Sequence, residues 1–373
     1  MVDSKHQWKA WLYLAPAIVL LLVFTVWPIV NTVSMAFQND YSALLAKRGV
    51  TFAVGIKNFQ SVLAYGGFMK NLVNTMLLCV ATVPLSTFLA LLIAVALNSI
   101  KFLRKAIQTI FFLPYVTNSI AIGMVFAAMF NIIGLRPGAP VADADSIGIV
   151  NYVFQFLHNI PYDVVDFAFG LFKAEPWGWL MTAINFIMDP VEWANFAFGL
   201  FKAEPWGWLV EMLELLRLEP KIWINQGSNY WANMAVMIVY IVWNALPFKI
   251  LVLLGGLQSV NKQYYDAAKV DGTPRRRVFT KITVPLLSPM IAYVVITGFI
   301  GGFKEYSSIV GIFGDTMGPA SEPGRLNTMV GYIYDSLATS SHGKASAAAL
   351  ILFGIIMVVT VINLQVSKKK VHY

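Results

Sequence analysis

The sequence contains one cysteine and few charged residues. Charged residues make up 12% of its 373 residues, whereas a soluble domain usually carries about 25%. Hydrophobic residues reach 58%, and the mean hydropathy is +0.67. This composition excludes an ordinary soluble domain folded around one core, so we predict a membrane protein.

The chain also lacks the residue patterns of a catalytic or metal centre. It has no phosphate-binding GxxxxGKS/T loop and no recognisable acid–base or nucleophile set. Its four histidines stand far apart, without the spacing of metal ligands, at positions 6, 158, 342 and 372. Cys79 lies in an apolar run, where a packed, inert thiol is expected. We therefore predict no catalytic residues, no metal and no cofactor in this chain.

The basic residues form short clusters between apolar stretches, which indicates a membrane protein rather than nucleic acid binding, despite the net charge of +8. Six segments are apolar enough and long enough to cross a bilayer, which takes roughly 17–25 residues. They cover about 11–34, 72–97, 108–131, 231–255, 283–303 and 345–366. We predict an all-α membrane protein with six transmembrane helices, the first of them retained rather than cleaved as a signal.

The charges of the connecting segments predict the orientation. The basic clusters precede span one, separate spans two and three and spans four and five, and follow span six. Segment 132–230 instead carries five Lys/Arg against eleven Asp/Glu. The positive-inside rule therefore places both termini in the cytoplasm and 132–230 outside. An eight-span alternative makes 177–200 a helical pair, but it would put Asp189 and Glu192 at the costly membrane centre.

We divide the chain into 1–131, the external insertion 132–230, and 231–373. The insertion contains a duplication, because Phe167–Leu180 and Phe196–Leu209 both read FAFGLFKAEPWGWL. The two copies could form amphipathic elements at the outer membrane surface or dock a partner. We favour a duplication within a loop that tolerates insertion.

The loop 258–289, between spans four and five, is the most informative segment. It reads QSVNKQYYDAAKVDGTPRRRVFTKITVPLLSP. Ser259 or Asn261 can cap a short helix that Gly272 ends, and Thr273 can cap a second helix with Pro274 at its first position. The pattern predicts two helices lying across the cytoplasmic membrane surface.

The spacing in this loop resembles the inner-membrane permeases of binding-protein-dependent ABC importers. Their signature is Glu-Ala-Ala, three residues, Gly, nine residues, then Ile-x-Leu-Pro. Here the chain has Asp266-Ala267-Ala268, Gly272, and Ile282 to Pro285 at the same intervals, with Asp for Glu and Val for Leu. An anionic-lipid-binding helix is the alternative, but basic charge alone would not explain this spacing.

The resemblance implies a coupling helix that sits in a cleft of a cytoplasmic ATPase, with the acidic residue paired to a basic group there. The residues it assigns to ATPase coupling are Tyr264, Asp266, Ala267, Ala268, Gly272, Ile282 and Pro285. Further segments resemble the sugar branch, in particular the maltose and oligosaccharide permeases: residues 55–59, 112–114, 257–259, 317–319, 332–334 and 343–347.

The implied protein is a transport subunit, not an enzyme, in a bacterial or archaeal cell membrane. The implied partners are a second homologous permease, two ATPase subunits that hold ATP and Mg, an external solute-binding protein and membrane lipid, with no nucleic acid. Polar residues in or beside the spans are candidates for the solute path, because such residues are costly in lipid. The candidates are Asn118, Asn244, Lys304, Glu305 and Tyr306, with Asn74 and Thr75 considered beside them. Helix–helix hydrogen bonds are the alternative for the isolated Asn residues, and a solvated ion pair for Lys304 and Glu305.

Two other functions remain open. The same importer could carry phosphate, an ion or a peptide, and we take an absence of charged residues deep in the spans to argue against an anion or ion. A secondary transporter working alone would need a buried carboxylate or histidine relay, and the first four spans contain no Asp, Glu or His.

Overall fold

The computed structural model describes residues 7–100, 109, 115, 117–133, 146–155 and 221–370. The duplicated copies and the 112–114 segment lie outside the described residues. Within the described part, the chain is mostly helical, as predicted. One short antiparallel pair, β1 (Ile132–Ile133) and β2 (Ser146–Ile147), departs from a purely α fold.

Four described helices are long and apolar enough to cross a membrane, and they match predicted spans one, two, four and six. They are Trp11–Phe37, Phe68–Ser99, Tyr230–Ser259 and His342–Lys368. Predicted span five is a bent pair, Arg275–Leu286 and Ser288–Gly302, with 67° between its parts. The described residues thus contain four candidate spans, or five if the bent pair is one span, and the count of six and the orientation stay predictions.

Predicted span three, 108–131, is not one continuous helix. Only α7 (Ser119–Phe130) is a described helix there, and Asn118 before it has extended backbone with φ −63° and ψ 123°. The Asn118 side chain accepts a hydrogen bond from the Ile120 N–H at 2.8 Å, so it caps α7. An apolar run alone could not show this break.

The chain forms two compact units. Unit 1 comprises Met1–Leu77, Ile296–Glu305 and Asn327–Lys370; unit 2 comprises Leu78–Val295, Tyr306–Leu326 and Val371–Tyr373. Helices α5 (Phe68–Ser99) and α16 (Ser288–Gly302) each contribute residues to both units.

Unit 1 is organised around α19 (His342–Lys370), which packs on α2, α4 and α18. Its other elements are α1 (Gln7–Leu21), the π-helical turn η2 (Leu22–Val26), α2 (Trp27–Phe37), α3 (Ala43–Ala46), α4 (Lys57–Leu63) and α18 (Met329–Ala338). Pro28 near the start of α2 cannot donate a backbone hydrogen bond, and the helix widens into η2 just before it.

A buried asparagine joins three parts of unit 1. The Asn58 amide donates to the carbonyls of Ala36 at 3.0 Å and Gln38 at 2.7 Å, and its oxygen accepts from the Asp40 N–H. A Cβ added to Gly343 would lie 2.6 Å from the Asn58 nitrogen, so only glycine fits there. The sugar-branch segments 55–59 and 343–347 therefore meet here and build the fold.

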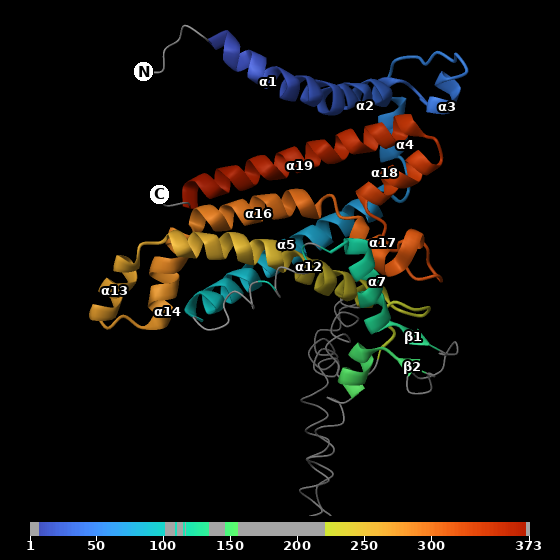
Figure 1. The fold of residues 1–373 in the computed structure, drawn as a ribbon. Coiled ribbons are helices and arrows are strands. Elements are labelled where there is room, and N and C mark those ends of the chain that lie inside the picture. The colour runs from blue at the N-terminus through green and yellow to red at the C-terminus, as the bar shows by residue number, and fades with distance from the viewer. Residues whose placement is uncertain are drawn as a thin grey trace, which may run out of the picture. The chain divides into compact units, whose positions relative to one another are not determined.

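Unit 2 centres on α12 (Tyr230–Ser259), which leads to α13 (Lys262–Val270) and α14 (Arg275–Val278) at one end (Figure 1). The chain continues through η6 (Phe279–Thr283), α15 (Val284–Leu286), α16, α17 (Ser307–Phe313) and η7 (Gly314–Thr316). Helices α7 and α17 cross closely, since a Cβ on Gly123 would lie 2.7 Å from the Gly311 Cα.

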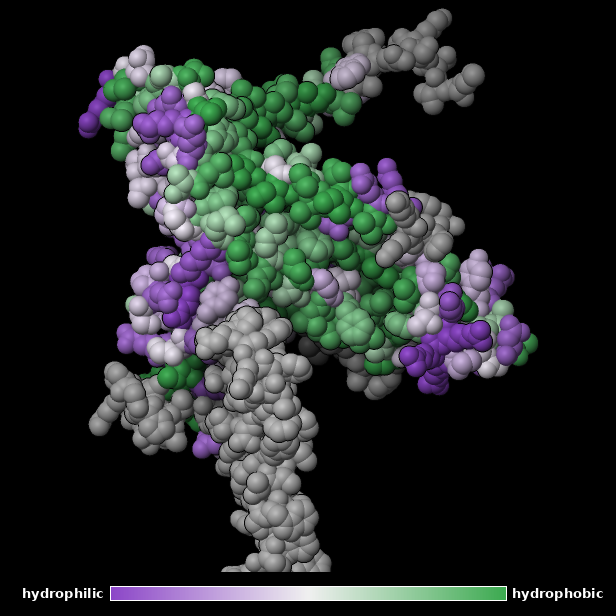
Figure 2. All heavy atoms as spheres, turned by 180° about the vertical axis from the view of Figure 1, so that it is seen from behind, coloured by the Kyte–Doolittle hydropathy of each residue, from purple (hydrophilic) through white to green (hydrophobic). Residues whose placement is uncertain are grey.

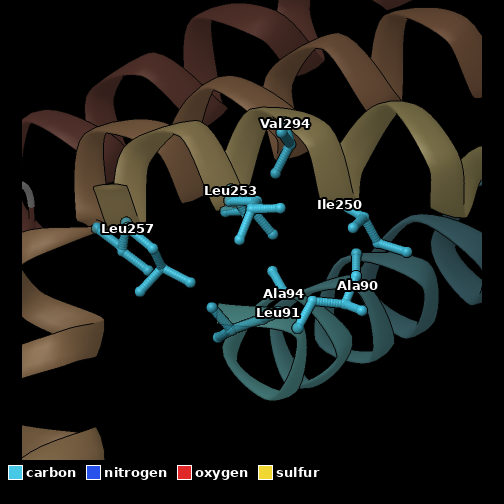
Figure 3. Packing of buried hydrophobic residues seen from close by; sticks show 10 residues of the cluster. Ala90, Leu91, Ala94, Ile250, Leu253, Leu257 and Val294 are labelled. Atoms are coloured by element: carbon cyan, nitrogen blue, oxygen red, sulfur yellow. The ribbon is translucent and has the colours of Figure 1, made fainter. Parts of the chain in front are cut away.

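The apolar core of unit 2 lies between α5, α12 and α16. Figure 3 shows side chains of α5 and α12 pointing toward one another, among them Ala94 and Leu253. Leu287, at the bend before α16, is 1% exposed in the same core. Figure 2 shows hydrophobic side chains along the sides of the long helices and hydrophilic ones toward their ends, the pattern expected in a bilayer.

Candidate functional site

The loop after α12 forms the predicted pair of helices. Asn261 caps α13, because its side-chain oxygen accepts from the Gln263 N–H at 3.0 Å. Ser259, the other candidate cap, instead donates its hydroxyl to the Gly256 carbonyl. Gly272 has φ +65°, in the left-handed region that glycine adopts freely, so it ends α13 as predicted.

The second helix starts one residue later than predicted. Pro274, rather than Thr273, precedes α14, and its carbonyl accepts from the N–H groups of Arg277 and Val278. The Thr273 N–H donates to the Ala268 carbonyl at 2.9 Å, so Thr273 belongs to the turn that closes α13. The prediction that Thr273 caps α14 is therefore wrong.

An arm made of η6 (Phe279–Thr283) and α15 (Val284–Leu286) continues from α14, and the chain turns sharply before α16. The π-helical turn η6 follows α14, Pro285 lies at the start of α15, and the chain bends by 67° between Leu286 and Ser288. Pro289 then opens α16 without a backbone donor. Predicted span five, 283–303, is thus a helix from Ser288 preceded by this bent arm.

The predicted coupling residues take different positions on the loop. Tyr264 is 55% exposed, and Asp266 and Ala267 are exposed on α13, while Ala268 is buried. Gly272 is exposed, whereas Ile282 and Pro285 are partly buried in the arm. Within the described residues, no ion pair involves Asp266. Tyr264, Asp266 and Ala267 are therefore exposed positions of α13 that a partner can contact.

One contact between α13 and the arm was not predicted. The Tyr265 hydroxyl and the Thr283 hydroxyl lie 3.4 Å apart, a long contact at the outer limit of a hydrogen bond. Thr283 is 5% exposed and lies in η6. Thr283 occupies the unspecified position of the Ile-x-Leu-Pro signature, so no sequence signal pointed to this contact.

One face of α12 carries aromatic residues and Asn244. Tyr240, Asn244 and Phe248 are four residues apart, so they share that face. The Tyr240 hydroxyl donates to the Ser119 carbonyl at 2.5 Å, and the rings of Phe248 and Tyr115 stack with centroids 5.8 Å apart.

Additional aromatic contacts extend this face. Phe126 lies 5.0 Å from the ring of Tyr240 and 5.1 Å from that of Trp243, and Tyr293 lies 6.5 Å from Phe248. Tyr115 and Tyr293 are about half exposed, 51% and 49%. These rings provide flat apolar surfaces beside a polar amide.

The structure brings Asn118 and Asn244 to the same α7–α12 contact, since each lies close along the chain to one end of the Tyr240–Ser119 hydrogen bond. Asn244 is partly buried, and among the described residues its side-chain amide makes no hydrogen bond. Lys304 and Glu305 instead form the turn that ends α16. The Glu305 carbonyl accepts from the Thr328 hydroxyl.

Tyr306 precedes α17, the helix that packs on α7. Asn74 and Thr75 form hydrogen bonds with neighbouring segments of the protein, the alternative to solute contact considered for the isolated Asn residues. The Asn74 amide donates to the Asn327 carbonyl at 2.9 Å, and the Thr75 hydroxyl accepts from the Met329 N–H. The segment 332–334 also has a packing role, since Tyr332 stacks on Tyr65 and burial raises the pKa of the Tyr332 phenol.

The interpretation that no charged residue lies deep in the spans is wrong. Lys249 lies within α12 and is 4% exposed. Its ammonium donates to the Val83 carbonyl at 3.1 Å, the Ser86 hydroxyl at 2.7 Å and the Thr87 hydroxyl at 2.9 Å. The sequence signal for this buried charge was Lys249 itself, a lone basic residue between Phe248 and Ile250 within an apolar run.

Comparison with known proteins identifies the family of the chain. The family described as "Binding-protein-dependent transport system inner membrane component" matches residues 83–372, most of the chain. The chain belongs to this family. Both the 258–289 loop and the α12 face of this inner membrane component lie inside the matched region.

The relatives of this inner membrane component include sugar and oligosaccharide permeases, which confirms the resemblance to the sugar branch. A lactose transport system permease protein of Rhizobium radiobacter is 25% identical over 95% of this chain and 91% of its own length. An arabinooligosaccharides transport system permease protein of Bacillus subtilis is 26% identical over 98% of this chain and 91% of its own length.

A solved structure shares the fold. It is a bacterial ABC transporter involved in the import of the acidic polysaccharide alginate, with a TM-score of 0.63 and 18% identity over 98% of this chain and 96% of the other. A related structure shows the alginate transporter in complex with a periplasmic protein bound to an alginate pentasaccharide. The family match and the apolar helices together make the chain a multi-pass membrane transport component.

Proposed function

We propose that the chain is the permease subunit of an ATP-driven, binding-protein-dependent importer of a sugar or oligosaccharide. The observation that carries this proposal is the loop after α12, whose signature spacing folds into a capped helix with Tyr264, Asp266 and Ala267 exposed. Family membership and the sugar permeases among the relatives support it.

In this proposal α13 sits in a cleft of a cytoplasmic ATPase, which holds the ATP and Mg. Asp266 pairs there with a basic group, and Tyr264 supplies contact area. Movement of α13 passes through the Tyr265–Thr283 contact into η6 and then through the bend into α16. A second homologous permease completes the path, two ATPase subunits drive it, and an external solute-binding protein delivers the solute. The complex lies in the lipid of a bacterial or archaeal cell membrane.

The α12 face suits a carbohydrate. Aromatic rings stack on the apolar faces of sugar rings, and an unpaired amide such as Asn244 bonds sugar hydroxyls. An anionic carbohydrate is a second candidate, because the buried ammonium of Lys249 removes the argument against a charged solute.

Charge reversal at Asp266 tests the coupling role. In the complex purified with its neighbours from the native membrane, Asp266→Lys should weaken ATPase association and uptake by about tenfold or more, because like charges across an interface repel. Co-purified ATPase and labelled oligosaccharide uptake are the measurements.

Asp315→Lys is the matched control, because Asp315 is an exposed carboxylate in η7, outside the loop. It should leave both quantities unchanged. Wild-type uptake by Asp266→Lys, or a purified wild-type complex that holds no ATPase, would contradict the proposal.

A further inference from the structure

Lys249 is a buried cation whose partners are all neutral. Its three N–H donors meet three acceptors on α5, at 2.7–3.1 Å, so the ammonium is fully hydrogen-bonded. Neither α5 nor α12 contains an Asp or Glu. A charge placed in a membrane span at this cost indicates a role beyond filling space.

The acceptors on α5 are already oriented toward α12. The Ser86 hydroxyl donates to the Thr82 carbonyl at 2.5 Å, and the Thr87 hydroxyl donates to the Val83 carbonyl at 2.7 Å. Because each hydroxyl proton is used inside α5, the oxygens present lone pairs to the ammonium. The three acceptors lie on adjacent turns of α5, so one group with three donors can bond all of them. A lysine ammonium has three N–H donors, whereas a glutamine amide has two.

This contact can set the rotation of α12. Helices in lipid have no strong hydrophobic force that selects one facing side, and the core against α5 consists of Ala, Leu and Ile side chains of similar character. A buried polar contact of fixed geometry is a known means of selecting one register. Lys249 follows Phe248 directly, so fixing Lys249 on α5 turns the Tyr240–Asn244–Phe248 face toward α7 and Tyr115.

We propose that Lys249 is a positioning residue that fixes the rotation of α12 on α5 and so aims Asn244 and Phe248 into the solute path. The placement of Asn244 and Phe248 in the solute path rests on the proposed function. The register itself is a property of unit 2 and can be measured without transport.

Disulfide trapping measures the register directly. Ala94 and Leu253 point toward one another across the core (Figure 3), so cysteines at both positions, in a Cys79→Ala background, report the native facing of α12. Lys249→Met keeps a long side chain but removes all three donors. It should slow oxidative crosslinking by about tenfold, the effect expected from losing a hydrogen bond to a charged group.

The acceptor variant separates hydrogen bonding from charge. Ser86→Ala with Thr87→Val keeps the Lys249 charge but removes two acceptors, so it should reproduce the crosslinking defect. Lys249→Arg, which retains donors, should restore part of the rate. Lys344→Met in α19 removes a lysine elsewhere and should leave the rate unchanged. Only protein that elutes as a single species in detergent is compared, so unfolded material does not count as a loss of register.

Transport supplies the second readout. In the assembled complex in vesicles, Lys249→Met and the acceptor variant should lower labelled malto-oligosaccharide uptake per ATP hydrolysed while ATP hydrolysis continues. A wild-type crosslinking rate in Lys249→Met overturns the inference. So does a normal rate in the acceptor variant beside a slow one in Lys249→Met, because charge rather than register would then be responsible. A wild-type complex without ATP-driven uptake would instead contradict the proposed function and leave the crosslinking result valid.

Discussion

At the scale of single residues, polar side chains in and beside the apolar helices differ in whether they bond neighbouring groups of the protein. Asn58, Asn74 and Thr75 bond neighbouring backbone groups in unit 1. Asn244 has no such partner among the described residues. Asn244 is only partly buried, so its amide stays accessible, and the proposed solute path would use it to bond a sugar hydroxyl.

Gly343 offers a test of the packing in unit 1. Gly343→Ala would place a Cβ 2.6 Å from the Asn58 nitrogen and 3.0 Å from the Tyr41 nitrogen. We expect it to destabilise the protein by about 1–3 kcal/mol, because neither neighbour can move without losing its hydrogen bonds. Thermal unfolding in detergent measures the effect.

Gly354→Ala, in the same helix, is the control. Nothing lies within 4 Å of a Cβ at that position, so it should be neutral or stabilise α19 by up to about 1 kcal/mol. Equal melting temperatures for both variants would contradict the role assigned to Gly343.

At the scale of elements, the proposed coupling depends most on the geometry of the segment from α13 to α16. Apolar periodicity predicts a helix over 283–303, yet the helix bends because Pro285 and Pro289 remove backbone donors and Leu287 packs into the core between α5 and α12. The cap of α13 and its glycine end are local chemistry, so the sequence predicts them. The 67° bend and the Tyr265–Thr283 contact depend on tertiary packing, so it does not.

The Tyr265–Thr283 contact should carry movement from α13 into the arm. Tyr265→Phe and Thr283→Val each remove one hydroxyl, and each should lower uptake per ATP hydrolysed by about two- to fivefold, the worth of one modest hydrogen bond. Because both remove the same contact, the double variant should lose little more than either single one. Uptake and ATP hydrolysis are measured together in vesicles.

Thr280→Val is the control for this pair. It removes a hydroxyl from the same π-helical turn, but among the described residues Thr280 bonds only the Arg276 and Arg277 carbonyls. Its uptake per ATP should match the wild type. Fully additive losses in the double variant would show that Tyr265 and Thr283 act separately.

At the scale of the whole molecule, the charge distribution predicts both termini and the 258–289 loop on the cytoplasmic side. A reporter that is active only in the cytoplasm should therefore work when fused after Tyr373. The same reporter inserted after Ala320, an exposed residue between η7 and α18, should be inactive. Reporter activity normalised to protein amount is the measurement, and the opposite pattern would overturn the predicted orientation.

The sequence by itself determined that this protein lies in a membrane, where four long apolar helices fall along the chain, and the signature spacing in the 258–289 loop. These are local properties, since apolar length, loop charge and capping residues act through the nearest neighbours along the chain. Only the tertiary structure decided that the chain bends by 67° before α16 and that segments 55–59 and 343–347 meet at Asn58. It alone showed that Lys249 bonds three oxygens of α5, because contacts between residues more than 150 positions apart depend on how the helices pack.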